Sequence, residues 1–119
     1  MKIVNCDLGI TIHNGKRYEW SKYILQKEKK FEGRIPREGS KWASLEIGDT
    51  LIFNLENGSV IKSRISNILK FKNFGEAFEK LGTELGPFDS IDEANDAYSF
   101  FSQEDIERFG MIAIQIELI

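Results

Sequence analysis

A β-hairpin near the middle of the chain is the feature that most constrains the fold. Apolar residues recur at alternate positions over residues 51–55 and again over 59–69, and Glu56-Asn57-Gly58 joins the two runs. An Asn-Gly turn between two such runs is among the strongest hairpin signals in a sequence. One face of the second run carries Ile61, Ile65 and Leu69, and the other carries Lys62 and Arg64. We therefore expect the core to be built on an antiparallel pair of strands.

Three further segments, residues 1–8, 31–35 and 111–118, show the two-residue period of strands. The last of them places its apolar side chains on one face: Ile112, Ile114, Ile116 and Leu118. Side chains of a strand point alternately to its two faces, so each segment can bury one face and expose the other. We expect all five segments to lie in one sheet or barrel.

Helical spacing occurs in short segments between the predicted strands. Residues 17–28 are expected to form a helix, because Trp20, Tyr23, Ile24 and Lys27 fall at i, i+3, i+4 and i+7. Residues 10–15 precede it as a loop that ends in the turn signal Asn14-Gly15.

Two capping boxes, Asn73-x-x-Glu76 and Ser90-x-x-Glu93, each begin a further helix. Tyr98 and Phe101 continue the apolar spacing of the second, and a short helix over residues 103–109 ends before a glycine. Interspersed helices and alternating strands indicate an α+β fold with antiparallel pairing.

Length and composition set the outer limits of the interpretation. At 119 residues, a single domain over residues 1–119 is expected. No apolar run approaches the about 20 residues that a membrane helix needs, and no leader segment is recognisable. Cys6 and His13 are the only residues of their types, so neither an intrachain disulfide nor a metal site is expected. We expect a cytoplasmic protein without a cofactor, and a monomer by default.

Charge is distributed unevenly along the chain. Residues 1–72 hold 14 basic and 8 acidic side chains, a net charge of +6, whereas residues 73–119 hold 2 basic and 11 acidic ones, a net charge of −9. A basic face built from the first part is compatible with nucleic-acid binding, since binding follows the local potential. The alternative is a solvated basic surface balanced by an acidic one.

The candidate site is the segment Lys29-Lys30-Phe31-Glu32-Gly33-Arg34. In a strand, Glu32 and Arg34 share a face, where they can orient each other and still offer contacts to a ligand. The loop after Pro36 adds Lys41 and Trp42, a composition that suits phosphates and a stacked base. The alternatives are an exposed ion pair and a Trp42 that covers the core.

The pattern Lys29-x-x-Glu32-x-Arg34, followed by Ile47-Gly48-Asp49-Thr50-Leu51-Ile52-Phe53, resembles the signature of the ASCH family. Residues 98–104 and 109–114 are similar to the family's closing helix and strand, so the resemblance runs from about residue 20 to residue 119. It implies a PUA-like fold: a small, mostly antiparallel β-barrel of five or six strands with three or four short helices. The Lys/Glu/Arg segment would line a cleft between barrel and helices.

Two functions follow from the resemblance. The first is a binding module for single-stranded RNA, a modified nucleoside or a nucleotide, held by Lys29, Lys30, Glu32, Arg34, Lys41 and Trp42. The second is an amidohydrolase that deacetylates N4-acetylcytidine with a Lys, a Thr and a Glu, which would correspond to Lys29, Glu32 and Glu84. Glu32 departs from the threonine of that pattern, and a carboxylate beside Lys29 favours an ion pair over a base. Binding is therefore the preferred hypothesis.

Overall fold

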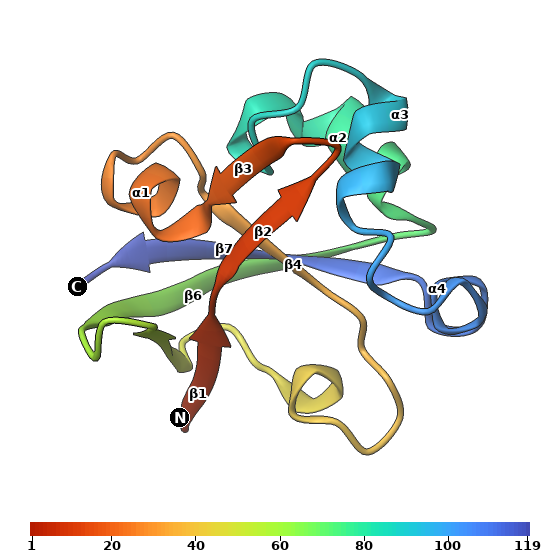
Figure 1. Cartoon of the computed structure of the whole chain (residues 1–119). Coiled ribbons are helices and arrows are strands. Elements are labelled where there is room, and N and C mark those ends of the chain that lie inside the picture. Colours follow the sequence, from red (N-terminus) through yellow and green to blue (C-terminus); the bar gives the residue numbers. More distant parts are fainter.

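A computed structural model describes residues 1–119 of the chain. A curled five-stranded sheet lies at the centre of the fold (Figure 1). Its strands, in spatial order, are β1 (Ile3–Leu8), β5 (Thr50–Leu55), β6 (Val60–Phe71), β7 (Met111–Leu118) and β4 (Phe31–Arg34). These are the five segments predicted from alternation, and all neighbouring pairs except the parallel β1–β5 pair are antiparallel. The expected α+β class and the mostly antiparallel sheet are thus confirmed.

The sheet is a half-barrel rather than the closed barrel that was expected. Its edge strands are β1 and β4, and no strand pairing joins them. The chain leaves the sheet directly after β1 to form the next strand, and β4 has only four residues. Side chains bridge the opening instead: Arg34 Nη2 lies 3.5 Å from the Asp7 carbonyl oxygen.

A second hairpin replaces the predicted loop at residues 10–15 and the start of the predicted helix at residue 17. Strands β2 (Ile10–His13) and β3 (Lys16–Glu19) pair around Asn14-Gly15. Both turn residues have left-handed φ angles, 50° and 77°, as a two-residue type I′ turn requires. The turn signal was interpreted correctly, but its flanking strands are too short for alternation to be recognised.

The first helix is consequently only Trp20–Leu25 (α1). Lys27, expected to lie along the apolar stripe of this helix, is exposed and has a φ of 62°, which ends the helical path. Trp20 and Ile24 are buried as predicted. After this turn the chain enters β4, and Lys29 is directed into the protein.

The remaining helices are α2 (Phe74–Leu81), α3 (Ile91–Ala97) and α4 (Gln103–Phe109), with short 3₁₀ segments η1 (Lys41–Ser44) and η2 (Gly82–Glu84). Asn73 and Ser90 cap α2 and α3 as predicted, accepting from the amides of Glu76 and Glu93 at 2.8 and 3.0 Å. Tyr98 and Phe101 lie beyond the end of α3, contrary to the predicted continuation of that helix. None of these helices is long and apolar enough to cross a lipid bilayer.

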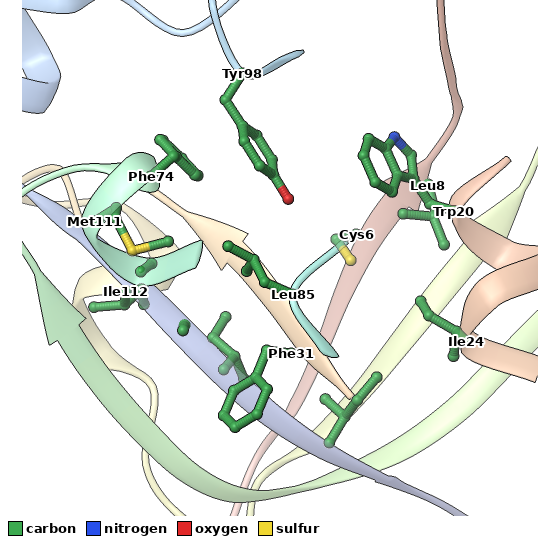
Figure 2. Packing of buried hydrophobic residues seen from close by; sticks show 14 of the residues in the cluster. Cys6, Leu8, Trp20, Ile24, Phe31, Phe74, Leu85, Tyr98, Met111 and Ile112 are labelled. Atoms are coloured by element: carbon green, nitrogen blue, oxygen red, sulfur yellow. The ribbon is translucent and has the colours of Figure 1, made fainter. Parts of the chain in front are cut away.

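The core is one cluster of 25 buried apolar residues between the sheet and the helices (Figure 2). An aromatic stack crosses it: the Phe74 and Tyr98 rings are 4.0 Å apart, Tyr98 and Trp20 are 6.0 Å apart, and Trp20 and Tyr18 are 5.1 Å apart. Each such pair stabilises the fold by about 1 kcal/mol beyond the gain from burying its apolar surface. The stack joins α2, the segment after α3 and the β2–β3 hairpin.

The Glu93 carboxylate connects the β2–β3 hairpin to α3. Its Oε1 accepts hydrogen bonds from Lys16 Nζ and Tyr18 Oη, both at 2.7 Å, and its Oε2 accepts from the amide of Asp89. The bond from Lys16 and the amide of Asp89 lower the pKa of Glu93 to about 2. Glu93 is therefore ionised at neutral pH and holds the hairpin against the helix.

The Gly-Asp part of the ASCH-like pattern has a structural role in this fold. Asp49 is buried, and its carboxylate accepts from the backbone amides of Lys2 at 3.0 Å and Glu46 at 2.9 Å. The Lys2 ammonium lies 3.2 Å from the same carboxylate. These backbone hydrogen bonds lower the pKa of Asp49, and they fix the start of β1 beside β5.

Candidate functional site

A pocket of about 180 Å³ lies in the opening between the two edge strands of the half-barrel. One wall is formed by residues 7–11, where β1 passes into β2, and the other by Glu32, Gly33 and Arg34 of β4. Aromatic side chains complete it: Trp20, Tyr98, Phe100 and Phe101. The fold thus brings the predicted Glu32–Arg34 pair to a concave site, and adds residues from the segment after α3.

Glu32 is buried, with 5% of its surface exposed, so the alternative of an exposed ion pair does not apply to it. Its Oε2 lies 3.5 Å from Arg34 Nη2, so the predicted contact between the two side chains is present. Its Oε1 accepts from the Gly33 amide at 3.1 Å. The face is buried because the β1–β2 segment and Tyr98 lie over it.

Lys29 is completely enclosed behind this pocket. Its ammonium donates to the backbone carbonyls of Phe31 and Leu85, and lies 3.8 Å from Glu32 Oε1 and 5.2 Å from the Trp20 ring. Burial lowers the pKa of Lys29 to about 8; the Glu32 carboxylate opposes this shift and Arg34 adds to it. Lys29 therefore positions Glu32 from behind rather than lining the pocket.

Lys29 and Glu32 also satisfy backbone groups at the open edge of β4. The Lys30 carbonyl accepts from the Ile116 amide, so the backbone groups of Phe31 and Gly33 point away from β7 in this antiparallel ladder. The Lys29 ammonium donates a hydrogen bond to the Phe31 carbonyl, and the Glu32 carboxylate accepts one from the Gly33 amide. An exposed edge would otherwise offer these groups to another strand.

Two buried donors at the pocket have no hydrogen-bond partner: Tyr98 Oη and Arg34 Nε. Tyr98 is 3% exposed, and Figure 2 shows its hydroxyl directed out of the aromatic layer toward the space between Cys6 and Leu85. Burial raises the pKa of Tyr98 well above its ordinary value, and the Glu32 charge adds to this, so the hydroxyl stays protonated. A buried unsatisfied donor costs about 1–3 kcal/mol.

The sequence pattern indicates Tyr98 only as an apolar residue at helical spacing. Its neighbours in the aromatic stack include Phe74, Phe88 and Phe101, which carry no polar group. Tyr98 is the one tyrosine among the phenylalanines of residues 73–119, and this was the available signal, because a buried hydroxyl normally has a partner.

The loop residues Lys41 and Trp42 lie next to Arg34. The Arg34 guanidinium is 4.8 Å from the centre of the Trp42 ring, and the Lys41 ammonium is 5.2 Å from it. Lys41 Nζ also donates to the Asn5 carbonyl at 2.6 Å, which fastens η1 to β1. Trp42 is half-buried against the edge of the core. Arg34 therefore links the pocket to this cationic and aromatic surface.

Lys30 and Glu84 are not brought to the pocket. Lys30 is exposed, its ammonium lies 3.3 Å from the Glu84 carboxylate, and its amide donates to the Glu84 carbonyl at 2.8 Å. The Glu84 side chain, on η2, is 47% exposed. The Glu84 carboxylate therefore cannot act together with Lys29 as the amidohydrolase hypothesis requires. Of this segment, the backbone carbonyl of the next residue, Leu85, accepts a hydrogen bond from the Lys29 ammonium.

The basic side chains of the first 72 residues lie in several different settings rather than on one face. Lys29 is buried, and Arg37 donates to Asp105 at 2.6 Å. Lys62 and Arg64 alternate with the buried Ile61, Ser63 and Ile65, and so lie on the outer face of β6. Arg34 lines the pocket and Lys41 lies beside it at the Trp42 ring, whereas Lys29 is enclosed behind it.

Together these features define a small α+β protein with an open half-barrel and, at its seam, a pocket lined by charged and aromatic side chains. The chain is similar over its full length to the hypothetical protein PH0355, which is known from a crystal structure. The two sequences are 30% identical, the comparison covers 100% of both chains, and the TM-score between the two structures is 0.74. Protein PF0455 from Pyrococcus furiosus, solved by solution NMR, is 28% identical over 98% of each chain, with a TM-score of 0.68. The chain belongs to the family of PH0355. No family model and no curated protein matches it.

Proposed function

We propose that this protein is an ASCH-like binding module, with a PUA-like half-barrel, that holds one base of single-stranded RNA or of a nucleotide in the pocket between β1 and β4. The observation that supports it most directly is the pair of buried donors, Tyr98 Oη and Arg34 Nε, left without partners beside the Glu32 carboxylate. A folded protein tolerates such groups where a ligand completes their hydrogen bonds.

The chemistry of the pocket matches the edge of a base. A ring carbonyl can accept from Tyr98 and Arg34, while an exocyclic amine can donate to Glu32. At about 180 Å³ the pocket is smaller than the about 300–1,000 Å³ of sites for drug-sized ligands, so it suits a single ring system. The sugar and phosphate would remain outside.

Outside the pocket, Lys41 and Trp42 are suited to the rest of the nucleotide. The Arg34 guanidinium is shared between the pocket and the Trp42 ring, so a base that binds to Arg34 has its phosphate within reach of Lys41. Trp42 can stack on a neighbouring base of a single strand. Lys30 is assigned no contact, because its ammonium pairs with Glu84.

An amidohydrolase remains the second candidate, favoured by one observation: the pKa of Lys29 is lowered to about 8, within the range of catalytic lysines. Its ammonium, however, already donates to two backbone carbonyls, and Glu84 is absent from the pocket. A reacting amide in the pocket would meet Tyr98, Arg34 and Glu32 instead. Binding therefore ranks above hydrolysis.

The test uses Tyr98→Phe and the matched control Tyr23→Phe, which alters a half-buried tyrosine outside the pocket. Each of the four nucleoside monophosphates and a short single-stranded RNA are titrated by NMR and calorimetry. Tyr98→Phe should weaken binding about tenfold, or about 1.4 kcal/mol, without lowering the free energy of unfolding, because the hydroxyl lacks a partner in the free protein.

Tyr23→Phe should bind as the wild type does. Absence of binding by the wild-type protein at millimolar nucleotide would contradict the proposed function. Conversion of N4-acetylcytidine to cytidine, followed by chromatography in the same samples, would reverse the ranking of the two candidates.

A cytoplasmic location is part of the proposal; the unpaired thiol of Cys6 is consistent with a reducing compartment.

A further inference from the structure

We propose that Phe100 is a mobile stacking residue that closes over the ring of the bound ligand, so that the pocket selects planar aromatic ligands. This inference rests on the proposed function. Phe100 lines the pocket, yet 61% of its surface is exposed. The other phenylalanines of the aromatic cluster are buried or partly buried. An apolar ring exposed at the rim of a pocket gains by covering a ligand.

The position of Phe100 in the chain places its ring close to Tyr98, whose buried hydroxyl has no hydrogen-bond partner. It follows Tyr98 by two residues, in the turn between α3 and α4. The Tyr98 ring is stacked on Phe74 at 4.0 Å with an interplanar angle of 18°. The Phe100 ring, in contrast, contacts Phe101 at 4.5 Å in a tilted arrangement and lies 6.2 Å from Tyr98. The Tyr98 ring is thus buried in a stack, while the Phe100 ring is mostly exposed.

The turn itself permits a change in the Phe100 side chain. Its backbone hydrogen bonds, from Ser99 to Asp96 and from Phe101 to Tyr98, hold the residues on either side of Phe100. Rotation about the side-chain bonds of Phe100 therefore needs no break in these bonds or in α4, which begins only at Gln103. Exposed side chains change rotamer on the picosecond to nanosecond scale.

Stacking makes a prediction that hydrogen bonding alone does not. A base stacked on an aromatic side chain gains about 1–3 kcal/mol, whereas a sugar phosphate has no ring face to cover. Tyr98, Arg34 and Glu32 would recognise the edge of the base, and Phe100 would recognise its face. The ligand class is therefore a planar heterocycle, and a free sugar phosphate should not fill the pocket.

The experiment compares Phe100→Leu, Phe100→Tyr and the control Phe109→Leu, a partly buried phenylalanine outside the pocket. Affinity is measured for the best-binding nucleoside monophosphate and for ribose 5-phosphate. Phe100→Leu should weaken nucleotide binding about 5- to 100-fold and leave ribose 5-phosphate unchanged, while Phe100→Tyr keeps the ring and binds as the wild type does. Phe109→Leu should not change the affinity.

A Phe100→Trp variant provides a direct signal, because the indole should change its fluorescence when a base stacks on it. If nucleotides bind to the wild type and Tyr98→Phe weakens them but Phe100→Leu does not, the stacking role is overturned and the proposed function stands. If no nucleotide binds to the wild type and the Phe100→Trp emission does not respond, both are overturned. Equal loss for nucleotide and ribose 5-phosphate in Phe100→Leu would also exclude stacking.

Discussion

The Lys29 ammonium donates a hydrogen bond to the carbonyl of Leu85, which lies 56 positions further along the chain. This bond connects the entrance to β4 with the segment that follows α2 and η2. The same ammonium binds the Phe31 carbonyl and lies 3.8 Å from Glu32 Oε1. Lys29 thus holds β4 and the segment after η2 together directly behind the pocket, and its removal should affect stability more than ligand contact.

We expect Lys29→Met to lower the free energy of unfolding by about 3–5 kcal/mol, because methionine fills the space but leaves two buried carbonyls without their donor and the buried Glu32 carboxylate with Arg34 as its remaining cation. Urea denaturation measures this loss. Lys30→Met is the control: it removes an exposed ion pair, which contributes at most about 1 kcal/mol. Similar losses in the two variants would contradict the structural role assigned to Lys29.

The ionisation of Lys29 should be unusual for a lysine. Burial lowers its pKa to about 8, so an NMR titration of the side-chain Cε resonance should show a midpoint near that pH, well below the ordinary lysine value of 10.5. Glu32→Gln should lower the midpoint further, because the carboxylate favours the charged ammonium. A midpoint of Lys29 close to 10.5, the ordinary value, would mean that the ammonium is hydrated.

Acid should release the hairpin from α3 through protonation of Glu93. Its pKa is about 2 in the folded protein and 4.5 as an ordinary side chain, so the native state binds this proton less tightly than the unfolded state does. The contribution of Glu93 to stability is therefore complete above about pH 4.5 and is lost as the pH falls toward 2.

Glu93→Gln tests this contribution. At neutral pH it should destabilise the protein by about 1.5–3 kcal/mol, since hydrogen bonds from Lys16 and Tyr18 to a charged carboxylate are lost. Between pH 4.5 and 2 the variant should lose less stability than the wild type, as shown by urea titrations at each pH. Glu79→Gln, on the exposed surface of α2, is the control and should show the wild-type pH dependence.

Gly33 provides a steric test of the pocket wall. A Cβ atom at this position would lie 2.9 Å from Cε1 of Phe74 and 3.3 Å from Cε of Met111. Because Phe74 is stacked on Tyr98, Gly33→Ala should displace both rings, destabilise the protein by about 1–3 kcal/mol and weaken nucleotide binding.

The matched control is Gly9→Ala, in the opposite wall of the same pocket. There the nearest atom to an added Cβ is Glu56 Oε1 at 3.6 Å, an ordinary contact. Thermal unfolding and nucleotide titration of the two variants should therefore differ clearly. Wild-type stability of Gly33→Ala would show that Phe74 can retreat freely, which its close stacking argues against.

The strands of the main sheet and the starts of α2 and α3 were predictable because their determinants are local. A two-residue period specifies a strand with one buried face, as in β6 and β7, and the caps at Asn73 and Ser90 depend on residues three positions away. The β2–β3 hairpin was missed apart from its turn. Its four-residue strands are too short to show a period, and the helical spacing of Trp20 and Ile24 extends only to Leu25.

The sequence alone determined the composition of the sheet and the proximity of Glu32 and Arg34, since residues two apart in a strand share a face. Only the tertiary structure decided how far the sheet closes, that Glu32 is buried, and that Tyr98 joins the site while Glu84 does not. Those outcomes depend on contacts between segments separated by tens of residues. Such contacts are set by how the sheet, the hairpin and the helices share one core, and no local pattern in the chain encodes that packing.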